Sequence, residues 1–208
     1  MKKYILYLIP LSFLVVSCQS LKKEVPNVKD SRLPLVGQWE AKTMIKSMET
    51  GEASIVNLDL LGQSPDLMRL EVTTSLGIAL ASVVLKTESI EYFLPRQKKY
   101  YHGVISDTAL FPILKIKVDP KLLLAAFFEK SYPNWACKAD NGMIESCTTS
   151  EGVLLKWDRE DKLVQRIIIT SPAFEVQIQI KKYTEKSAFP EKALLLKVPD
   201  SYKRFELK

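Results

Sequence analysis

The stretch from Glu175 to Lys181 alternates strictly between polar and apolar side chains. This two-residue period is typical of a β-strand with one face on a core and the other in water. Similar segments recur along the chain, separated by residues that favour turns, such as Gly51. The sequence predicts strands over residues 38–48, 53–61, 67–74, 79–85, 88–94, 98–105, 144–149, 153–158, 163–170, 173–183 and 192–197.

One interruption of the strand pattern predicts a helix. Asp119 is a good N-cap acceptor, and Pro120 suits the first helical position. This helix is expected to end near Lys130, and residues 108–114 are a candidate for a second short helix. The apolar stripe of the main helix is predicted to consist of Leu122, Leu123, Ala126 and Phe127.

The element count constrains the architecture of residues 35–208. About ten or eleven antiparallel strands with one or two short helices predict a mainly β (α+β) domain built on a single sheet. A sheet of that width must curl to bury its apolar face. One solution is an open half-barrel with the helices as a lid over an apolar cavity. The alternative is a sheet curled tightly enough to be filled by its own side chains.

The amino terminus has the pattern of an export signal. Lys2 and Lys3 precede an apolar run from Tyr4 to Val16. That run is shorter than the roughly 20 apolar residues that a membrane-spanning helix needs. Residues 1–17 are therefore predicted to be a signal peptide.

The residues from Leu14 to Cys18, Leu-Val-Val-Ser-Cys, resemble the bacterial lipobox. The resemblance implies cleavage before Cys18 and lipidation of that cysteine. Because Gln19 and not Asp follows, it also implies a lipid anchor in the outer membrane of a Gram-negative bacterium, facing the periplasm. Residues 18–34 are predicted to form a flexible tether. The alternative is an ordinary signal peptide followed by a chance cysteine.

The charge distribution and the glycine content argue against two classes of protein, namely nucleic-acid-binding proteins and proteins with a glycine-rich phosphate-binding loop. The 208 residues carry 30 Lys+Arg and 24 Asp+Glu, a formal net charge of +6. Loss of Lys2 and Lys3 with the signal peptide leaves 28 bases against 24 acids, or +4. These charges are interspersed, whereas nucleic-acid-binding domains usually cluster their bases on one face. The 7 glycines form no phosphate-binding loop, so no cofactor is expected.

Cys137 and Cys147 form an even pair once the lipidation site is set aside, which favours a disulfide in an exported protein. Asn141-Gly142 between them is a strong hairpin signal. A two-residue turn there would place Cys137 opposite Ser146, whereas a three-residue loop would place it opposite Cys147. The pair therefore predicts the longer loop. A metal or redox pair is the alternative, but it lacks further ligands and a C-x-x-C spacing.

His102 is the single histidine of the chain. It lies in a strand-like segment with no nucleophile elbow and no acid or base partner at a recognisable spacing. The prediction is therefore a solvated or core-edge histidine, no catalytic residue and no metal site.

A longer stretch, from Leu58 to Leu85, resembles the outer-membrane lipoprotein receptor LolB of the LolA–LolB lipoprotein-localisation family. In that family a protruding loop with an exposed leucine followed by glycine joins two strands, and Leu76 and Gly77 hold these places. With the order of strands, helical insert and strands, the resemblance covers roughly residues 38–183. The pair of Cys137 and Cys147 and the carboxyl-terminal tail, residues 188–208, have no counterpart in that family.

The resemblance implies a monomeric receptor that takes acylated lipoproteins from a LolA-like periplasmic carrier and inserts them in the outer membrane. Cys18 would anchor it, and the loop Ser75-Leu76-Gly77 would touch the bilayer. The candidate residues for an acyl-chain cavity, each of which has an ordinary core position as its alternative, are Leu58, Leu60, Leu70, Val72, Val83, Leu85, Ile90, Tyr92, Phe93, Leu123 and Phe127.

Two further alternatives remain open. A passive lipid-binding or glycolipid-binding lipoprotein, or an envelope sensor, would use the same cavity without transfer, and Leu76 would then be an incidental turn residue. The basic run from Arg96 to Lys99 is either a solvated turn or a contact for anionic headgroups.

Overall fold

The computed structural model describes residues 36–63, 66–161 and 163–207, and these form one large sheet with a few short helices. The predicted signal peptide, Cys18 and the tether lie outside the described residues. The strands are β1 (Val36–Ser47), β2 (Ala53–Gln63), β3 (Leu67–Thr74), β4 (Ala79–Lys86), β5 (Ser89–Leu94), β6 (Lys99–Val104), β7 (Ala136–Asp140), β8 (Met143–Thr148), β9 (Leu154–Glu160), β10 (Leu163–Thr170), β11 (Phe174–Glu185) and β12 (Lys203–Leu207).

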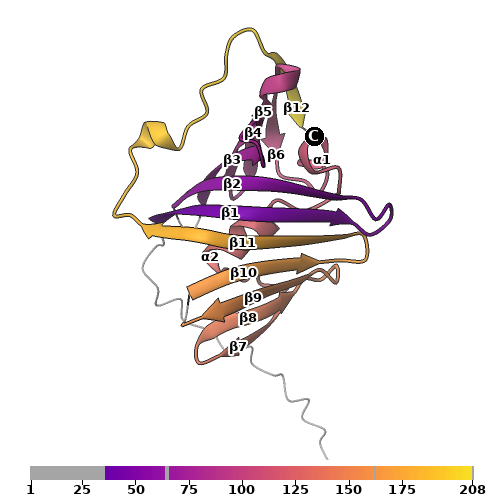
Figure 1. Ribbon diagram of the computed structural model, residues 1–208, viewed down its shortest axis with the longest axis vertical. Helices are drawn as coiled ribbons and strands as arrows, with labels where there is room; N and C mark the ends of the chain where they lie inside the picture. The colour runs from indigo at the N-terminus through magenta and orange to yellow at the C-terminus, as the bar shows by residue number, and fades with distance from the viewer. Residues whose placement is uncertain (1–35, 64–65, 162, 208) are drawn as a thin grey trace, which may run out of the picture. The chain divides into compact units, whose positions relative to one another are not determined.

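The sheet consists of two meanders that meet at its centre. Its strand order is β12-β6-β5-β4-β3-β2-β1-β11-β10-β9-β8-β7 (Figure 1). Strand β1 pairs with β2 on one side and with β11 on the other, both antiparallel. The two outermost strands, β12 and β7, do not pair with each other, so the sheet stays open. This confirms the predicted mainly β fold with a single curved, unclosed sheet.

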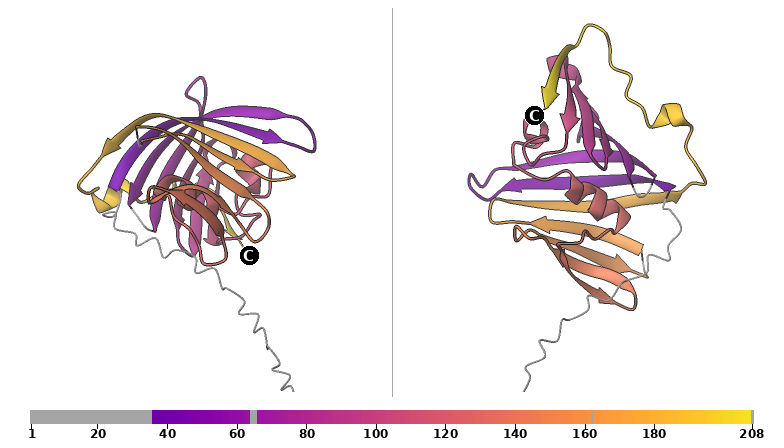
Figure 2. Two further views of the ribbon diagram at one scale, coloured as in Figure 1. Left: turned by 90° about the horizontal axis from the view of Figure 1, so that it is seen from below. Right: turned by 180° about the vertical axis from the view of Figure 1, so that it is seen from behind.

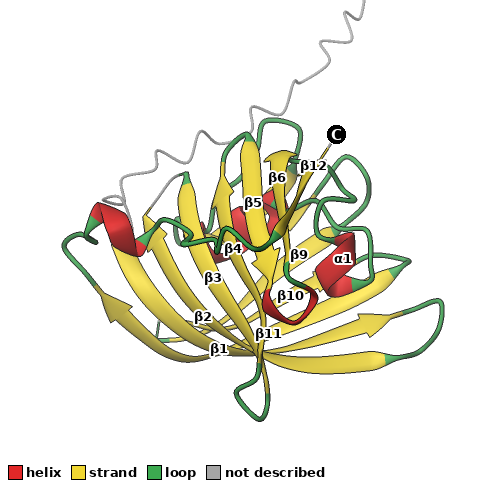
Figure 3. Cartoon of the chain, turned by 90° about the horizontal axis from the view of Figure 1, so that it is seen from above, coloured by secondary structure: helices red, strands yellow, loops and turns green. Residues whose placement is uncertain are grey.

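The connection between the two meanders carries the helices. It contains α1 (Phe111–Leu114) and α2 (Lys121–Phe128), and both lie on the concave side of the curved sheet (Figures 2 and 3). Two 3₁₀ turns, η1 (Pro95–Gln97) and η2 (Glu191–Ala193), lie in other connections. The alternating burial of β1, β3 and β5 follows from this arrangement, because every second side chain points to the covered face.

Helix α2 begins one residue later than predicted, at Lys121 with Pro120 as its N-cap residue, and it ends slightly earlier than predicted. The Asp119 carboxylate accepts a hydrogen bond of 2.9 Å from the backbone N–H of Lys121. The helix ends at Phe128, because Glu129 adopts a left-handed conformation with φ 49°. The buried face is wider than the predicted stripe, and Leu123 is only half-buried. The fully buried residues are Leu122, Leu124, Ala125, Ala126, Phe127 and Phe128.

The sheet has twelve strands, more than predicted, because β7 and β12 were not expected as strands. The strand predicted over 192–197 is wrong: this segment holds η2 and irregular chain. Its apolar residues suggested a strand, but Leu194 alone is buried, at 3% exposure. The Arg69 guanidinium fixes the segment by donating to the carbonyls of Ala193 and Leu195, at 2.9 and 3.0 Å.

The chain after β11 thereby reaches the far edge of the sheet (Figure 1). There β12 pairs with β6 in parallel, the one parallel contact between the described strands. Phe205 of β12 stacks on Tyr101 with ring centroids 5.1 Å apart, and Tyr202 meets Phe93 edge-to-face at 5.7 Å. The carboxyl-terminal tail is thus an integral part of the sheet.

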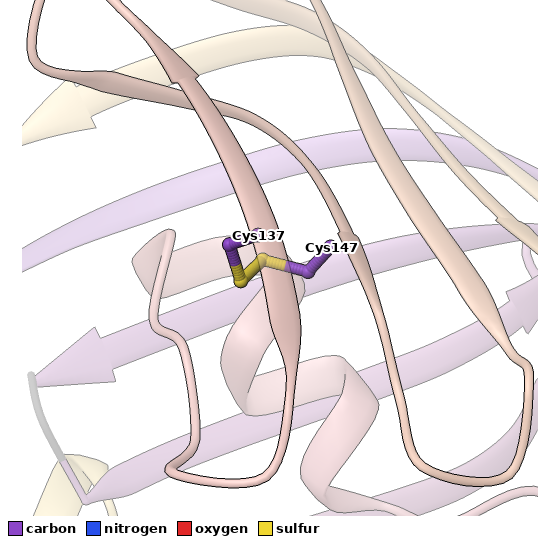
Figure 4. Close-up of a disulfide and its surroundings, with 2 residues drawn as sticks. All are labelled: Cys137 and Cys147. Carbon is purple, nitrogen blue, oxygen red and sulfur yellow. A yellow bond between two sulfur atoms is a disulfide. The ribbon is translucent and has the colours of Figure 1, made fainter. Parts of the chain in front are cut away.

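Cys137 and Cys147 lie directly opposite each other and are joined by a disulfide (Figure 4). The expected three-residue loop is wrong, because the turn consists of Asn141 and Gly142 alone, both with positive φ. Such a turn matches the twist of a hairpin. The register is restored by a bulge that leaves Glu145 without a partner residue across the hairpin.

Candidate functional site

An apolar cavity of about 50 Å³ lies between the sheet and the segment that carries α1 and α2. Its wall is apolar except for one threonine. It is lined by Thr43, Ile45, Val56, Leu58, Leu70, Val72, Val83, Leu110, Ile113, Leu114, Val118, Leu123, Ile169, Val176 and Ile178.

The residues expected at an acyl-chain cavity fall into three groups. The first lines this cavity: Leu58, Leu70, Val72, Val83 and Leu123. The second is buried in the same core but away from the cavity: Leu60, Leu85, Ile90, Tyr92 and Phe127. The third is Phe93 alone, which is half-buried against Tyr202.

The placement of Phe93 follows from the period of β5. Ile90 and Tyr92 face the core, so the residue between Tyr92 and Leu94 must face the other side of the sheet. Its assignment to the cavity is therefore wrong.

Most of the lining that the sequence analysis missed comes from the second meander and the lid, but Thr43, Ile45 and Val56 of β1 and β2 were missed as well. Ile169, Val176 and Ile178 come from β10 and β11, where the alternating pattern gave a usable signal. Leu110 and Val118 come from the connection around α1, which has no regular period. Only the three-dimensional structure places those two.

The lid is tied to the sheet by a buried tyrosine. The Tyr92 hydroxyl donates to the carbonyl of Ala109 at 2.9 Å. Burial, with a smaller contribution from Tyr101, raises the pKa of Tyr92, so the hydroxyl stays protonated and remains a donor. Within the lid, the Val118 N–H donates to the Asp107 carbonyl at 2.8 Å and closes the loop. These bonds hold α1 over the cavity.

Thr43 is the one polar residue of the cavity wall. Its side chain is buried, at 2% exposure, and its hydroxyl has no hydrogen-bond partner among the described residues. A buried hydroxyl without a partner is unfavourable by about 1–3 kcal/mol. The wall of the cavity is therefore apolar apart from this one hydroxyl group.

The cavity as observed is too small for a lipid chain. Sites for small ligands have volumes of roughly 300–1,000 Å³, whereas this one measures about 50 Å³. Its lid residues Ile113, Leu114 and Leu123 are only half-buried. The structure thus describes a closed form, and an acyl chain requires the lid to move outward.

The turn between β3 and β4 presents Leu76 to solvent, at 85% exposure. Hydrogen bonds fix its shape, because the N–H of Gly77 donates to the carbonyl of Thr74 at 2.9 Å and Gly77 has φ +79°. Ile78 beside it is also exposed, at 48%. The turn η1, which packs beside the start of β4, adds the exposed side chains of Arg96 and Lys98.

The polar and aromatic residues around His102 contact one another. His102 is exposed on β6 and stacks on Tyr100 with centroids 5.4 Å apart. The Tyr100 hydroxyl donates to Glu91 at 2.8 Å, and burial together with this bond raises the pKa of Tyr100 to about 12. Within the described ranges, no group of three or more His, Cys, Asp or Glu residues could hold a metal ion. None of the helices described is long and apolar enough to cross a membrane.

Comparison with known proteins reveals similarity in structure alone. No protein-family model and no curated protein matches the chain. A DUF1329 family protein from Desulfovibrio piger superposes with a TM-score of 0.54 at 8% identity, over 81% of this chain and 95% of the other. This likeness shows a shared fold.

Two other solved structures match less closely. A LolA superfamily protein from Nitrosomonas europaea has a TM-score of 0.49 at 9% identity, over 80% of this chain and 93% of that one. A domain from Vibrio parahaemolyticus, provisionally described as an outer membrane lipoprotein-sorting domain, has the same score at 9% identity, over 76% and 88%. The resemblance to the receptor LolB in particular stays a prediction.

Proposed function

We propose that the protein is a lipid-anchored lipoprotein of the bacterial envelope that binds acyl chains between its curved sheet and its helical lid. The observation that carries the proposal is the cavity between sheet and lid, whose wall is apolar apart from Thr43. An apolar wall without satisfied polar groups offers nothing to a polar substrate, but it suits a hydrocarbon chain.

The physical need for such a cavity is large. Transfer of each methylene group of an acyl chain from water to an apolar environment is favourable by about 0.8 kcal/mol of free energy. A chain of ordinary length therefore cannot be released through water on a useful timescale. A protein that carries an acyl chain must therefore transfer the chain directly from one apolar environment to another.

The full proposal is that lipidated Cys18 anchors the chain in the outer membrane, where it receives lipoproteins from a LolA-like periplasmic carrier and inserts them. Two observations support this step. Leu76 is held in solvent by a hydrogen-bonded turn, at 85% exposure. The basic turn η1 beside it provides Arg96 and Lys98 for headgroup contact.

The binding proposal is tested by native mass spectrometry and by titration with a fluorescent fatty acid. Purified protein should carry species with the masses of lipids, and Leu123→Gln should weaken binding because it places an amide in the cavity wall. Leu195→Gln is the matched control, since Leu195 lies in the segment between β11 and β12 and is 43% exposed. Absence of binding by the unaltered protein would overturn the proposal.

The transfer step is tested separately at Leu76. Leu76→Glu should leave folding and acyl-chain binding unchanged, because exposed substitutions usually alter stability by less than about 0.5 kcal/mol. Delivery of a bound lipoprotein to liposomes should fall, because a carboxylate resists the acyl region. Val104→Glu, at a residue with 63% exposure on β6, is the control. Unchanged delivery by Leu76→Glu would favour a passive binder or sensor.

A further inference from the structure

Strands β10 and β11 separate before either of them ends. Their ladder runs only from the Arg166–Gln179 pair to the Thr170–Glu175 pair. Yet β10 begins at Leu163 and β11 continues to Glu185. Beyond Arg166, β10 stays paired with β9 alone, and β11 stays paired with β1 alone, within the described ranges. The sheet therefore has a lateral opening between residues 163–165 and 180–183.

Both sides of this opening carry a β-bulge. On β10 the register with β9 skips Gln165, and on β11 the register with β1 skips Lys181. A bulge bends its strand and re-aims the neighbouring side chains. Two bulges that face each other across the same gap explain why the strands diverge there.

An open pocket of about 340 Å³ occupies the lateral opening. This volume lies within the range of roughly 300–1,000 Å³ typical of small-ligand sites. Its inner wall is aromatic, because Trp39 packs against Phe127 at 5.9 Å and against Tyr183 at 5.0 Å. Gly37 makes room for this cluster, since a Cβ at that position would lie 2.4 Å from the Tyr183 ring.

The pocket and the cavity lie along the same strands. Ile167 and Ile180 line the pocket, and the next inward residues on the same strands, Ile169 and Ile178, line the cavity. Only apolar side chains of β10 and β11 thus separate the opening from the cavity, whose wall also includes the half-buried Leu123 of α2.

The outer edge of the opening is polar and basic. Lys181 and Lys182 line it, and Lys181 donates to Gln179 at 2.7 Å while Lys182 is 3.3 Å from Glu40. The carboxylate on this edge, Glu129, forms a buried ion pair of 2.7 Å with Arg159. An aromatic interior with an ammonium-lined mouth matches an amphiphile that has one apolar chain and one anionic head.

We propose that the lateral opening between β10 and β11 is the port through which the acyl chain of an anionic amphiphile reaches the cavity, with its head held at Lys181. This inference rests on the proposed function, because it assumes that the cavity holds acyl chains. A carboxylate and a phosphate head share the chemistry that the site recognises.

The test uses the full-length protein with dansyl-undecanoic acid and its uncharged methyl ester. Lys181→Glu should weaken binding of the acid about three- to tenfold, the size expected for an exposed charge interaction, and leave binding of the ester unchanged. Lys138→Glu is the matched control, because Lys138 is an exposed lysine on β7 of the same sheet. Equal binding of the acid by Lys181→Glu and the unaltered protein would overturn the role of Lys181.

A second variant tests the path itself. Gln165→Trp places a large ring at the edge of the opening and should slow the association of both probes in stopped-flow measurements, with Gln97→Trp on the exposed turn η1 as control. Association at the unaltered rate would overturn the port while the acyl-binding proposal stands. Failure of the unaltered protein to bind either probe would overturn both. If the probe binds, displacement by laurate or by lysophosphatidylglycerol identifies the head as carboxylate or phosphate, and either result supports the port.

Discussion

The two halves of the sheet, on either side of β1, differ in how firmly they are held. In the first half, β4 is buried on both faces from Ala81 to Leu85. In the second half, β10 has only Ile167 and Ile169 buried, and its first three residues leave β11 altogether. Strands β4 and β10 nevertheless have eight residues each and antiparallel neighbours on both sides. The difference must therefore come from what covers them.

The cover of the first half is the chain after β11. Leu194 is buried, and Arg69 binds the carbonyls on either side of it. Arg69 also holds Glu71 at 2.6 Å, and Ser82 donates to the same carboxylate. The second half has no comparable cover on its outer face among the described residues, and a disulfide joins β7 to β8 there. We infer that the first half is a rigid support and that movement is confined to the second half and the lid.

The largest predicted effect is on the rigid half. Leu194→Ala should lower the free energy of unfolding by about 2–5 kcal/mol, as for other buried leucines, and should speed amide exchange in β4 and β12. Leu195→Ala is the control, and because that residue is 43% exposed it should alter stability little. Equal effects of the two substitutions in chemical denaturation would show that the segment between β11 and β12 does not stabilise this half of the sheet.

The second prediction concerns the disulfide that closes the other half. Cys137→Ser combined with Cys147→Ser should lower the free energy of unfolding by about 2–3 kcal/mol, with faster amide exchange confined to β7–β9. Thiol counting on the unfolded, unreduced mature protein should find neither cysteine free. Two titratable thiols would contradict the disulfide. Faster exchange in β4 would contradict the division into a rigid and a mobile half.

Much of this architecture could be predicted from the sequence, because alternating strands report their own period. The strands 67–74 and 163–170 are predicted at their observed positions, and the start of α2 is predicted to within one residue. The pattern fails where burial does not alternate. Strand β7 is almost wholly exposed, and β12 is held by aromatic stacking and by pairing with β6, so neither carries an apolar period.

The site was less predictable, for a related reason. Periodicity tells which face of a strand is covered, but not which covered residues border a void. Leu58 and Leu60 have the same pattern, yet only Leu58 lines the cavity. The lateral opening had no signal at all, because the bulges at Gln165 and Lys181 depend on pairing between distant strands. The three-residue loop predicted between the cysteines failed in the same way, since a bulge at Glu145 sets the register.

The third prediction lies at the junction of the two halves, where Thr43 of β1 faces the cavity. Thr43→Val keeps the shape of the side chain and removes a buried hydroxyl without a partner in the described residues. It should raise the free energy of unfolding by about 1 kcal/mol. Thermal denaturation of the two proteins checks this. A loss of stability would show that the hydroxyl has a partner in solution, such as water, and that the cavity is not dry.

The smallest predicted effect is a pH dependence beside the lateral opening. Asp158 is held by Lys156 and Arg166, each at 2.8 Å, and Arg166 is the last residue of β10 that still pairs with β11. Hydrogen bonding to Lys156, and then to Arg166, lowers the pKa of the Asp158 carboxyl. A carboxyl whose pKa is lower in the folded state stabilises the fold above its unfolded pKa of about 3.9. That contribution is lost as the pH falls through the folded-state value.

Asp158→Asn should therefore lower the free energy of unfolding at pH 7 by less than about 1 kcal/mol, because the group is partly exposed. The difference between variant and unaltered protein should shrink below about pH 4 and vanish below the folded-state pKa. A double-mutant cycle with Arg166→Gln isolates the pair, and its coupling should follow the same pH course. A pH-independent difference would mean that Asp158 acts through packing alone. The end of the β10–β11 ladder would then be fixed by the bulges without help from this ion pair.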